Sequence, residues 1–230
     1  MARIISLISN DIKSGKTTIA FNIATLLGNK NKKTLLVNLE HKSSYLKLMP
    51  NKNSTVVKNI IKPFELVQYE KHFSILILSD SKINCKKLLL KQIQLLTNKY
   101  DYIILDTSYI WNDLTNECLR ISKEVFLVYD SKNFVTNELR RNLNFIRKLQ
   151  PQNPNLKLTT IMLNNYDLHR HMEALLEINK LTNNKYLLIT LPFQKELLTI
   201  TDESIKFIKY NKATDYADQL SKVINHLINE

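Results

Sequence analysis

Apolar and polar positions alternate along the chain in blocks that predict strands and helices in turn. Short continuous apolar runs, each the length of one buried strand, lie at residues 3–8, 34–39, 73–78, 102–106, 125–129, 158–163 and 186–191. Helical spacing covers residues 16–27, 86–97, 133–149, 167–178 and 214–228, and residues 43–64 are interpreted as helical or irregular. Continuous apolar strands between helices are typical of a parallel sheet with both faces covered. We therefore expect an α/β fold of three layers, with a mostly parallel, doubly wound sheet and helices on both faces.

Two of the predicted helices carry an apolar stripe along one side. The stripes consist of Leu139, Leu143, Ile146 and Leu149 in one helix, and of Leu220, Val223, Ile224 and Leu227 in the last one. Such spacing more often marks a side that faces the core than a membrane anchor. No apolar run reaches the roughly 18 residues that a membrane span requires. We therefore expect no membrane partner.

The polar segment Ser9–Thr18 separates the first predicted strand from the first predicted helix. It contains Gly15-Lys16-Thr17, and a strand, Gly-Lys-Thr and a helix in this order form the layout of a phosphate-binding loop. Lys16 would reach the β- and γ-phosphates, and the Thr17 hydroxyl would bind Mg²⁺. The alternative is an ordinary strand–helix turn with a solvated lysine. Asn10 stands where the motif has its first glycine, and asparagine adopts left-handed backbone conformations more readily than other non-glycine residues.

Two carboxylates follow predicted strands on the side where this loop would lie. Asp106 ends the apolar run of residues 102–105, which is the position of a Walker-B aspartate that holds Mg²⁺, although a helix N-cap is an alternative role. Glu40 lies two residues after Asn38, so both side chains would project toward one crevice. A carboxylate there can orient or deprotonate an attacking water, and an exposed loop glutamate is the alternative.

Composition limits the class of protein. The chain has 230 residues, 44% of them hydrophobic, which suits a single domain over residues 1–230. Of its two glycines, Gly15 lies in the loop and Gly28 is expected to cap the first helix, so other turns must rely on Asn and Asp. Cys85 and Cys118 are isolated, and the first residues lack the layout of a signal peptide. We expect a cytoplasmic protein with reduced thiols and no metal cluster of histidines and cysteines.

The formal net charge of +12 favours acidic partners, of which nucleic acid is the usual one. A general bias toward Lys, Asn and Ile would account for the charge equally well. Candidate DNA contacts are Arg140, Arg141, Arg147 and Lys148 on one predicted helix, and Lys206, Lys209 and Lys212 before the last one. A solvated helix face is the alternative for any one of them.

These residues together resemble the ParA/MinD family of P-loop ATPases, and the resemblance runs through most of the chain. The family motif K-G-G-x-G-K-T-T is matched by residues 11–18, the D-x-D motif by Asn38-Leu39-Glu40, and the strand ending in D-T by Leu105-Asp106-Thr107. The strand end Ile161–Asn164 and Leu191-Pro192-Phe193 resemble the elements that hold the base. The resemblance implies ATP and Mg²⁺ as cofactors. Its nucleotide-binding residues would be Lys13, Ser14, Gly15, Lys16, Thr17, Thr18, Asn164 and Pro192, with Thr17 and Asp106 at the metal.

The departures from the family motif fall on the residues that carry its chemistry. Asp11 replaces a signature lysine that reaches the partner subunit's phosphates, and an aspartate there would repel a triphosphate. Ile12 and Lys13 replace two glycines, so we expect the loop to take a different path or to lose phosphate contacts, with Lys13 as a possible substitute charge. Asn38 cannot accept a proton, which leaves Glu40 as the second candidate catalytic residue and predicts at most a weak ATPase.

Two functions remain open at this point. The resemblance implies a homodimer that positions DNA, a plasmid or other cellular cargo by ATP-dependent self-association, non-specific DNA binding and a ParB-like or machinery partner, with a cytoplasmic, nucleoid-associated location. The alternative is a non-hydrolysing scaffold that localises a pilus, flagellar or secretion assembly through protein contacts. A kinase on the same fold is a third interpretation, for which the sequence offers no acceptor site.

Overall fold

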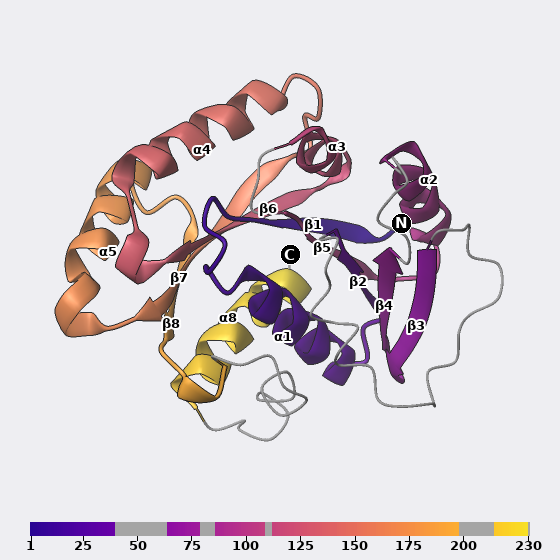
Figure 1. Cartoon of the computed structure of the whole chain (residues 1–230), viewed down its shortest axis with the longest axis horizontal. Coiled ribbons are helices and arrows are strands. Elements are labelled where there is room, and N and C mark those ends of the chain that lie inside the picture. Colours follow the sequence, from indigo (N-terminus) through magenta and orange to yellow (C-terminus); the bar gives the residue numbers. More distant parts are fainter. Residues whose placement is uncertain (40–63, 79–85, 109–111, 198–213, 230) are drawn as a thin grey trace.

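The computed structural model describes residues 1–39, 64–78, 86–108, 112–197 and 214–229 (Figure 1). Their strands are β1 (Arg3–Ile8), β2 (Thr34–Asn38), β3 (Phe64–Glu70), β4 (Phe73–Leu78), β5 (Tyr102–Asp106), β6 (Glu124–Asp130), β7 (Lys157–Tyr166) and β8 (Leu187–Pro192). The helices are α1 (Lys16–Asn29), α2 (Lys86–Leu96), α3 (Asp113–Ile121), α4 (Thr136–Leu149), α5 (Leu168–Thr182) and α8 (Asp215–Asn229), with short 3₁₀ turns η2 (Ser131–Asn133) and η3 (Lys195–Leu197).

The strands form one twisted sheet in the order β3-β4-β2-β5-β1-β6-β7-β8. Every neighbouring pair is parallel except β3 and β4, which pair as an antiparallel hairpin at one edge. The central strands β1, β5 and β6 are buried along nearly their whole length, as continuous apolar strands between two helix layers must be. The expected three-layer, mostly parallel, doubly wound α/β fold is confirmed.

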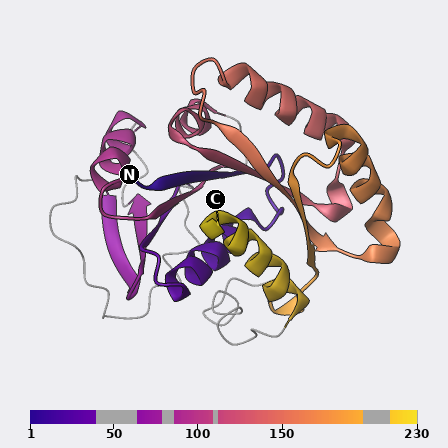
Figure 2. The ribbon, with the colours of Figure 1, turned by 180° about the vertical axis from the view of Figure 1, so that it is seen from behind.

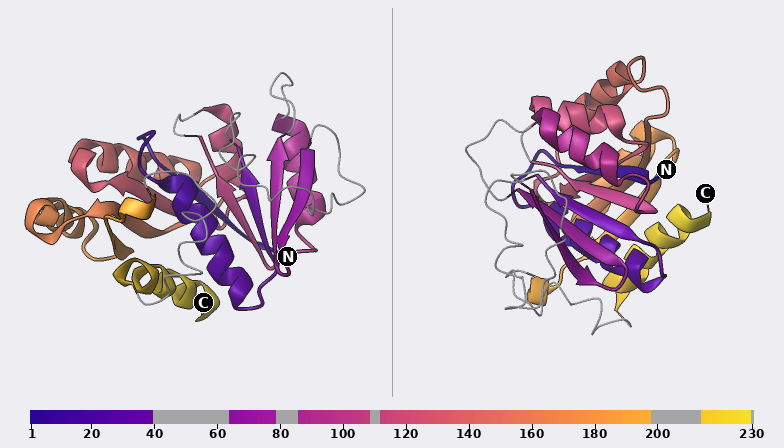
Figure 3. Two further views of the ribbon diagram at one scale, coloured as in Figure 1. Left: turned by 60° about the horizontal axis from the view of Figure 1, so that its bottom comes forward. Right: turned by 90° about the vertical axis from the view of Figure 1, so that its right-hand side faces the viewer.

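The helices divide between the two faces of the sheet (Figures 1 and 3). α1 and α8 cover one face, where their apolar residues share a single core with β1, β5 and β6. On the other face, α2 and α3 pack over the β2–β5 half of the sheet, and α4 and α5 over the β6–β8 half. The view from behind shows the same division (Figure 2). The sheet therefore separates α1, which follows the phosphate-loop segment, from the helix that carries the candidate DNA-binding arginines.

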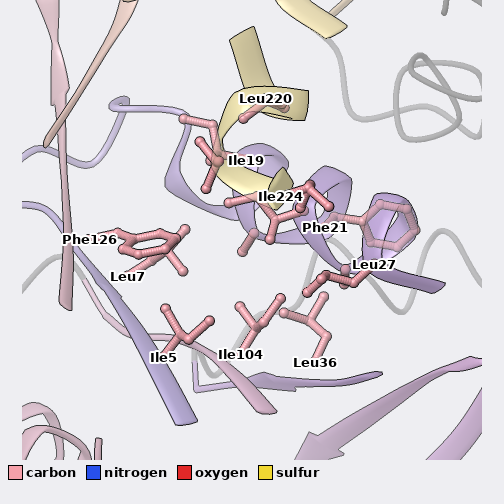
Figure 4. Packing of buried hydrophobic residues seen from close by; sticks show 14 of the residues in the cluster. Ile5, Leu7, Ile19, Phe21, Leu27, Leu36, Ile104, Phe126, Leu220 and Ile224 are labelled. Atoms are coloured by element: carbon pink, nitrogen blue, oxygen red, sulfur yellow. The ribbon is translucent and has the colours of Figure 1, made fainter. Parts of the chain in front are cut away.

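The core under α1 and α8 fixes the position of the loop. Ile19 and Phe21 of α1 are at most 1% exposed, and Leu220 and Ile224 of α8 pack beside them over the sheet (Figure 4). The two predicted apolar stripes are buried, which confirms that the last helix faces the core. The end of α8 is tied down as well, because the Leu227 carbonyl accepts hydrogen bonds from Arg3 and from the Tyr102 hydroxyl.

The structure corrects several local expectations. β3 covers residues 64–70 and α3 covers residues 113–121, neither of which the sequence pattern predicted. Gly28 does not cap α1, because it lies inside the helix and Lys30 is the cap residue. Asn10 does not adopt the left-handed conformation that would substitute for glycine. The expected reliance of turns on asparagine is confirmed, since all four described non-glycine residues with positive φ are asparagines: Asn31, Asn165, Asn183 and Asn184.

Candidate nucleotide-binding site

The loop between β1 and α1 lies at the carboxyl end of the central strand, where open α/β sheets bind ligands. Gly15, the last loop residue, has a φ of 78°, which side chains other than glycine rarely adopt. A Cβ atom there would lie 2.2 Å from Nδ2 of Asn164, whose amide donates a hydrogen bond to the Ser14 carbonyl at 2.9 Å. Both the backbone angle and the approach of Asn164 therefore require glycine at position 15.

The start of α1 is suited to an anion. No side chain caps this end of the helix, and its first turn contains no acidic residue. The first N–H groups of a helix have no partner within the helix, and the helix dipole favours negative charge at this end. A phosphate group satisfies both requirements.

Lys16, Thr17 and Asp106 meet directly above this helix start. Asp106 ends β5, which pairs with β1 in a register that sets Asp106 beside Leu7. One oxygen of its carboxylate accepts a hydrogen bond from the Lys16 ammonium at 3.1 Å, and the other accepts one from the Thr17 hydroxyl at 2.8 Å. The Lys16 and Asp106 side chains are 4% and 0% exposed, so each charge is neutralised by the other. The predicted phosphate-binding lysine and both predicted metal ligands therefore share one small site.

Asn38 lies at the same edge of the sheet. It is the last residue of β2, is buried, and stands opposite Asp106 in the strand register. Glu40, the other candidate catalytic residue, lies outside the described residues. The expectation that both side chains face one crevice therefore stays a prediction.

Asp11 organises the degenerate half of the loop. Its carboxylate accepts hydrogen bonds from the Lys13 backbone N–H at 3.0 Å and from the Asn133 side-chain amide at 3.1 Å. Ile12, which lies between Asp11 and Lys13 in the sequence, is 70% exposed. Asn10 reaches the side chain of Asn142 on α4 at 3.4 Å. The Asp11 carboxylate thus accepts a hydrogen bond from the Lys13 N–H, a loop amide of the kind that a phosphate-binding loop donates to its ligand.

The short turn η2, which follows β6, contributes residues that sequence reasoning missed. Ser131 donates a hydrogen bond from its hydroxyl to the Asn164 carbonyl at 2.7 Å, and Asn133 bonds Asp11. Because Asn164 also bonds the Ser14 carbonyl, η2 and the end of β7 hold the loop from one side. No signal in the sequence separates these polar residues from those of an ordinary turn.

The remaining candidate nucleotide-binding residues lie around this centre. Lys13 is exposed, and Thr18 is half-buried in the first turn of α1. Pro192 ends β8, in register with Tyr166 of β7. Next to it, the Phe193 ring lies 5.5 Å from the Lys132 ammonium, a cation–π distance. The structure therefore places Asn164 against the loop and Pro192 at the neighbouring strand end.

The candidate DNA-binding residues lie elsewhere. Arg140, Arg141, Arg147 and Lys148 are exposed on α4, and Lys206, Lys209 and Lys212 fall outside the described residues. Within the described part of the chain, no helix is long and apolar enough to cross a membrane, and no group of three or more His, Cys, Asp or Glu residues could hold a metal ion. Burial raises the pKa of the Cys118 thiol to about 12, so it is an unreactive core residue.

The sheet order, the loop between β1 and α1, and the Lys16–Asp106 pair define a P-loop nucleotide-binding fold. The model of the CobQ/CobB/MinD/ParA nucleotide-binding domain family matches residues 5–207, and the chain belongs to this family. The ParA/MinD resemblance of the sequence is thereby confirmed. The comparison with curated proteins gave no match.

Solved structures show the same fold over the whole chain. The cell division ATPase MinD of Pyrococcus furiosus superposes with a TM-score of 0.78 at 20% identity, covering 100% of this chain and 99% of that one. MinD of Pyrococcus horikoshii OT3, complexed with Mg-ADP, gives 0.76 at 22% identity, covering 99% and 96%. A putative plasmid partition protein of Borrelia burgdorferi B31, bound to AMPPNP, gives 0.71 at 22% identity, covering 99% and 98%.

Proposed function

We propose that this protein is a ParA-like ATP-binding protein that positions or partitions DNA, a plasmid or other cellular cargo. It would act in the cytoplasm, on or near the nucleoid, by ATP-dependent self-association as a homodimer, non-specific DNA contact and a ParB-like or machinery partner. The single observation that carries the nucleotide-binding part is the convergence of Lys16, Thr17 and Asp106 on the uncapped start of α1. Family membership and nucleotide-bound relatives support it.

The residues present fit Mg-ATP. Lys16 supplies the ammonium for the β- and γ-phosphates, and the first turn of α1 supplies backbone N–H groups. A hydroxyl and a carboxylate, from Thr17 and Asp106, are the oxygen donors that Mg²⁺ prefers, and they already lie 2.8 Å apart. When bound, Mg²⁺ would neutralise phosphate charge and orient the triphosphate. Asp106 would then exchange its bond to Lys16 for the metal, which frees the ammonium for phosphate.

Turnover should be slow at best. Asn38 is the residue opposite Asp106, and its neutral amide cannot take a proton from an attacking water. ATP binding and hydrolysis are therefore separable in this protein. We expect a weak ATPase at most, with conversion of ATP and water to ADP and phosphate depending on Glu40.

Titration calorimetry with ATP, with and without Mg²⁺, tests the site. We expect Mg²⁺ to strengthen ATP binding to the wild type, and Thr17→Val to abolish that gain, weakening Mg-ATP binding by about tenfold or more, equivalent to ~1.4 kcal/mol. This variant keeps the buried Lys16–Asp106 pair, whose disruption by Lys16→Ala would cost about 3–5 kcal/mol of folding stability. Thr182→Val, at the far end of α5, is the matched control. A wild type that binds no ATP would overturn the proposal.

A second candidate function follows from the Asp11 side chain. Because its carboxylate already bonds a loop amide and Asn133, the loop is held in shape without a ligand. This arrangement favours the non-hydrolysing scaffold that localises a pilus, flagellar or secretion assembly through protein contacts. Phosphate release separates the two functions: a rate equal to that of buffer, together with no ATP binding, leaves only the scaffold.

A further inference from the structure

A row of lysines follows the edge of the sheet at which the parallel strands begin, opposite the P-loop. The left view of Figure 3 shows this edge beside the N-terminus. We call the row the basic edge, and it consists of Lys71 before β4, Lys33 before β2, Lys99 before β5, Lys123 before β6, Lys157 at the start of β7 and Lys185 before β8. All six lysines are exposed. The order of the strands in the sheet makes these residues neighbours in space, although they lie far apart in the chain.

Main-chain hydrogen bonds hold neighbouring strand starts side by side along the basic edge. In each bond the N–H of the first residue donates to the carbonyl of the second: Thr34 to His72 at 2.8 Å, Asp101 to Lys33 at 2.7 Å, Arg3 to Asp101 at 2.8 Å, Lys123 to Ile4 at 2.9 Å and Lys157 to Lys123 at 2.9 Å. Neighbouring strands are about 4.8 Å apart, so the row from β4 to β8 is roughly 29 Å long. This length is close to one turn of B-DNA, about 34 Å.

The basic edge carries more positive than negative charge. Its turns contain two carboxylates, Glu70 and Asp101, against the six lysines. Glu124, at the start of β6, is 1% exposed and is bonded by the Arg3 guanidinium and the Thr159 hydroxyl, so it does not offset a lysine. Among the described residues, none of the six ammonium groups forms a salt bridge. Their mutual repulsion would be relieved by a bound polyanion.

The opposite edge of the same sheet lacks this pattern. The parallel strands end there at Ile8, Asn38, Leu78, Asp106, Asp130, Tyr166 and Pro192, and none of these residues is a lysine. A general bias toward lysine would place it at both ends of the strands. β1 has six residues, about 20 Å, so the basic edge also lies well away from the P-loop at the end of this strand. A partner held at the basic edge would leave the nucleotide site open.

The chemistry of the basic edge favours a phosphate backbone over a lipid surface. Peripheral attachment to a bilayer depends on apolar side chains that enter it as well as on charge. The turns of the basic edge contain none of the exposed large apolar side chains of the described residues, and Met1 and Leu95 come closest in the sequence. Lysine ammonium groups contact phosphate oxygens without reading bases, so binding here would be independent of base sequence and sensitive to salt.

We infer that the basic edge is a second surface for duplex DNA, which it holds by the phosphate backbone. The inference deepens the DNA contact of the proposed function and rests on it. Arg147, in the last turn of α4, lines one cavity with Lys157 and Lys185, so the end of α4 extends this surface. Arg140 and Arg141, earlier on α4, are separate candidates.

Acetylation of the wild type, with and without short random-sequence duplex DNA, tests the surface, because peptide mapping reports each lysine separately. DNA at about ten times its Kd should slow acetylation of the six edge lysines by about tenfold, since only the unbound fraction reacts. Lys87 and Lys132, which follow the carboxyl ends of β4 and β6, should keep their rates. Protection of Lys148 without protection of the edge lysines, or equal protection of all exposed lysines, would overturn the inference. Protection by vesicles of phosphatidylglycerol and phosphatidylcholine but not by DNA would also overturn it, by assigning the edge to lipid.

A charge-reversed pair provides the second measurement. Lys71→Glu with Lys157→Glu should reduce the slope of log K against log salt by about 2, since each phosphate contact contributes about 0.9. Lys87→Glu with Lys91→Glu on α2 is the matched control, and an equal effect of the two pairs would count against the edge. Mg-ATP calorimetry on the same variants reports the nucleotide site independently and should show unchanged affinity. A protein that binds no DNA loses both this inference and the DNA part of the proposed function, whereas DNA binding that leaves the edge lysines reactive removes only the inference.

Discussion

At the scale of single residues, Asp11 has the greatest effect on the candidate site. It stands where the family resemblance places a lysine, and its carboxylate bonds both a loop amide and Asn133. A negative charge about 4 Å from a phosphate oxygen costs about 1–4 kcal/mol, depending on solvation. Asp11, in place of the lysine, therefore gives the loop an internal negative charge that competes with the phosphates of a nucleotide.

The substitution Asp11→Asn separates charge from shape. The amide oxygen of asparagine can still accept the Lys13 N–H, while the negative charge is lost. We expect Mg-ATP to bind about tenfold more tightly than to the wild type, equivalent to ~1.4 kcal/mol of relieved repulsion. Calorimetry measures this directly, and Asp218→Asn on the exposed side of α8 is the matched control. Unchanged or weaker binding would show that the Asp11 charge does not limit affinity.

The residues of the site differ in how far the sequence could predict them. Lys16, Thr17 and Asp106 could be found because a Gly-Lys-Thr after one strand, with an aspartate at the end of another, is a pattern typical of phosphate and Mg²⁺ binding. Ser131 and Asn133 could not be found, because their roles depend on the position of η2 beside the loop. That position is set by the pairing of β6 with β1 and β7, which is tertiary.

At the scale of elements, α8 illustrates how a short amphipathic pattern is interpreted. Its apolar stripe is buried under the sheet, and the Leu227 carbonyl near its end is held by Arg3 and Tyr102. The stripe therefore contributes to the core and is not available to a lipid surface. Continuous apolar runs predicted most strands for the same reason, namely that both faces of the sheet are covered.

Leu220→Ala tests this role of α8. Leu220 is 0% exposed, so the substitution should lower the free energy of unfolding by about 2–5 kcal/mol through lost burial and a residual cavity. Urea denaturation followed by circular dichroism measures the change. Lys222→Ala, on the exposed side of the same helix, should change stability by less than about 0.5 kcal/mol. An equally small effect of both variants would contradict the packing described for α8.

The elements that sequence reasoning missed have weaker patterns. β3 is an edge strand in which only Phe64, Leu66 and Val67 are buried, and it pairs antiparallel with β4, whereas the other neighbouring strands of the sheet are parallel. α3 has nine residues, of which only Thr115, Cys118 and Leu119 are buried. Neither element has the long continuous apolar run or the extended helical stripe that identified the others. Both elements depend on the tertiary arrangement of the sheet, and the sequence pattern of a single segment does not reveal that arrangement.

At the scale of the whole molecule, the net charge of +12 includes the four exposed cations of α4: Arg140, Arg141, Arg147 and Lys148. Exposed cations on α4 lie on the face of the sheet away from α1. The same helix also contacts the loop between β1 and α1, because Asn10 donates a hydrogen bond to Asn142 at 3.4 Å. Arg140 and Arg141 therefore belong to a helix that packs against the candidate nucleotide site.

Binding of random-sequence duplex DNA across a series of salt concentrations tests that surface. We expect affinity to fall as salt rises, and Arg140→Glu with Arg141→Glu to reduce the slope of log K against log salt by about 2, since each phosphate contact contributes about 0.9. Lys87→Glu with Lys91→Glu on α2 makes the same charge change elsewhere and should leave the slope nearly unaltered. Affinity that ignores salt, or an equal effect of both pairs, would assign the charge to composition instead of to a binding face.

The contact between Gly15 and Asn164 links two positions that lie far apart in the chain. A Cβ atom at position 15 would overlap the Asn164 amide, so position 15 cannot gain a side chain while Asn164 keeps its place. Relatives in which position 15 has gained a methyl group should have lost the amide at position 164, and with it the bridge from β7 to the loop. Paired substitutions at positions 15 and 164 would thus identify relatives that have lost the nucleotide-binding pocket.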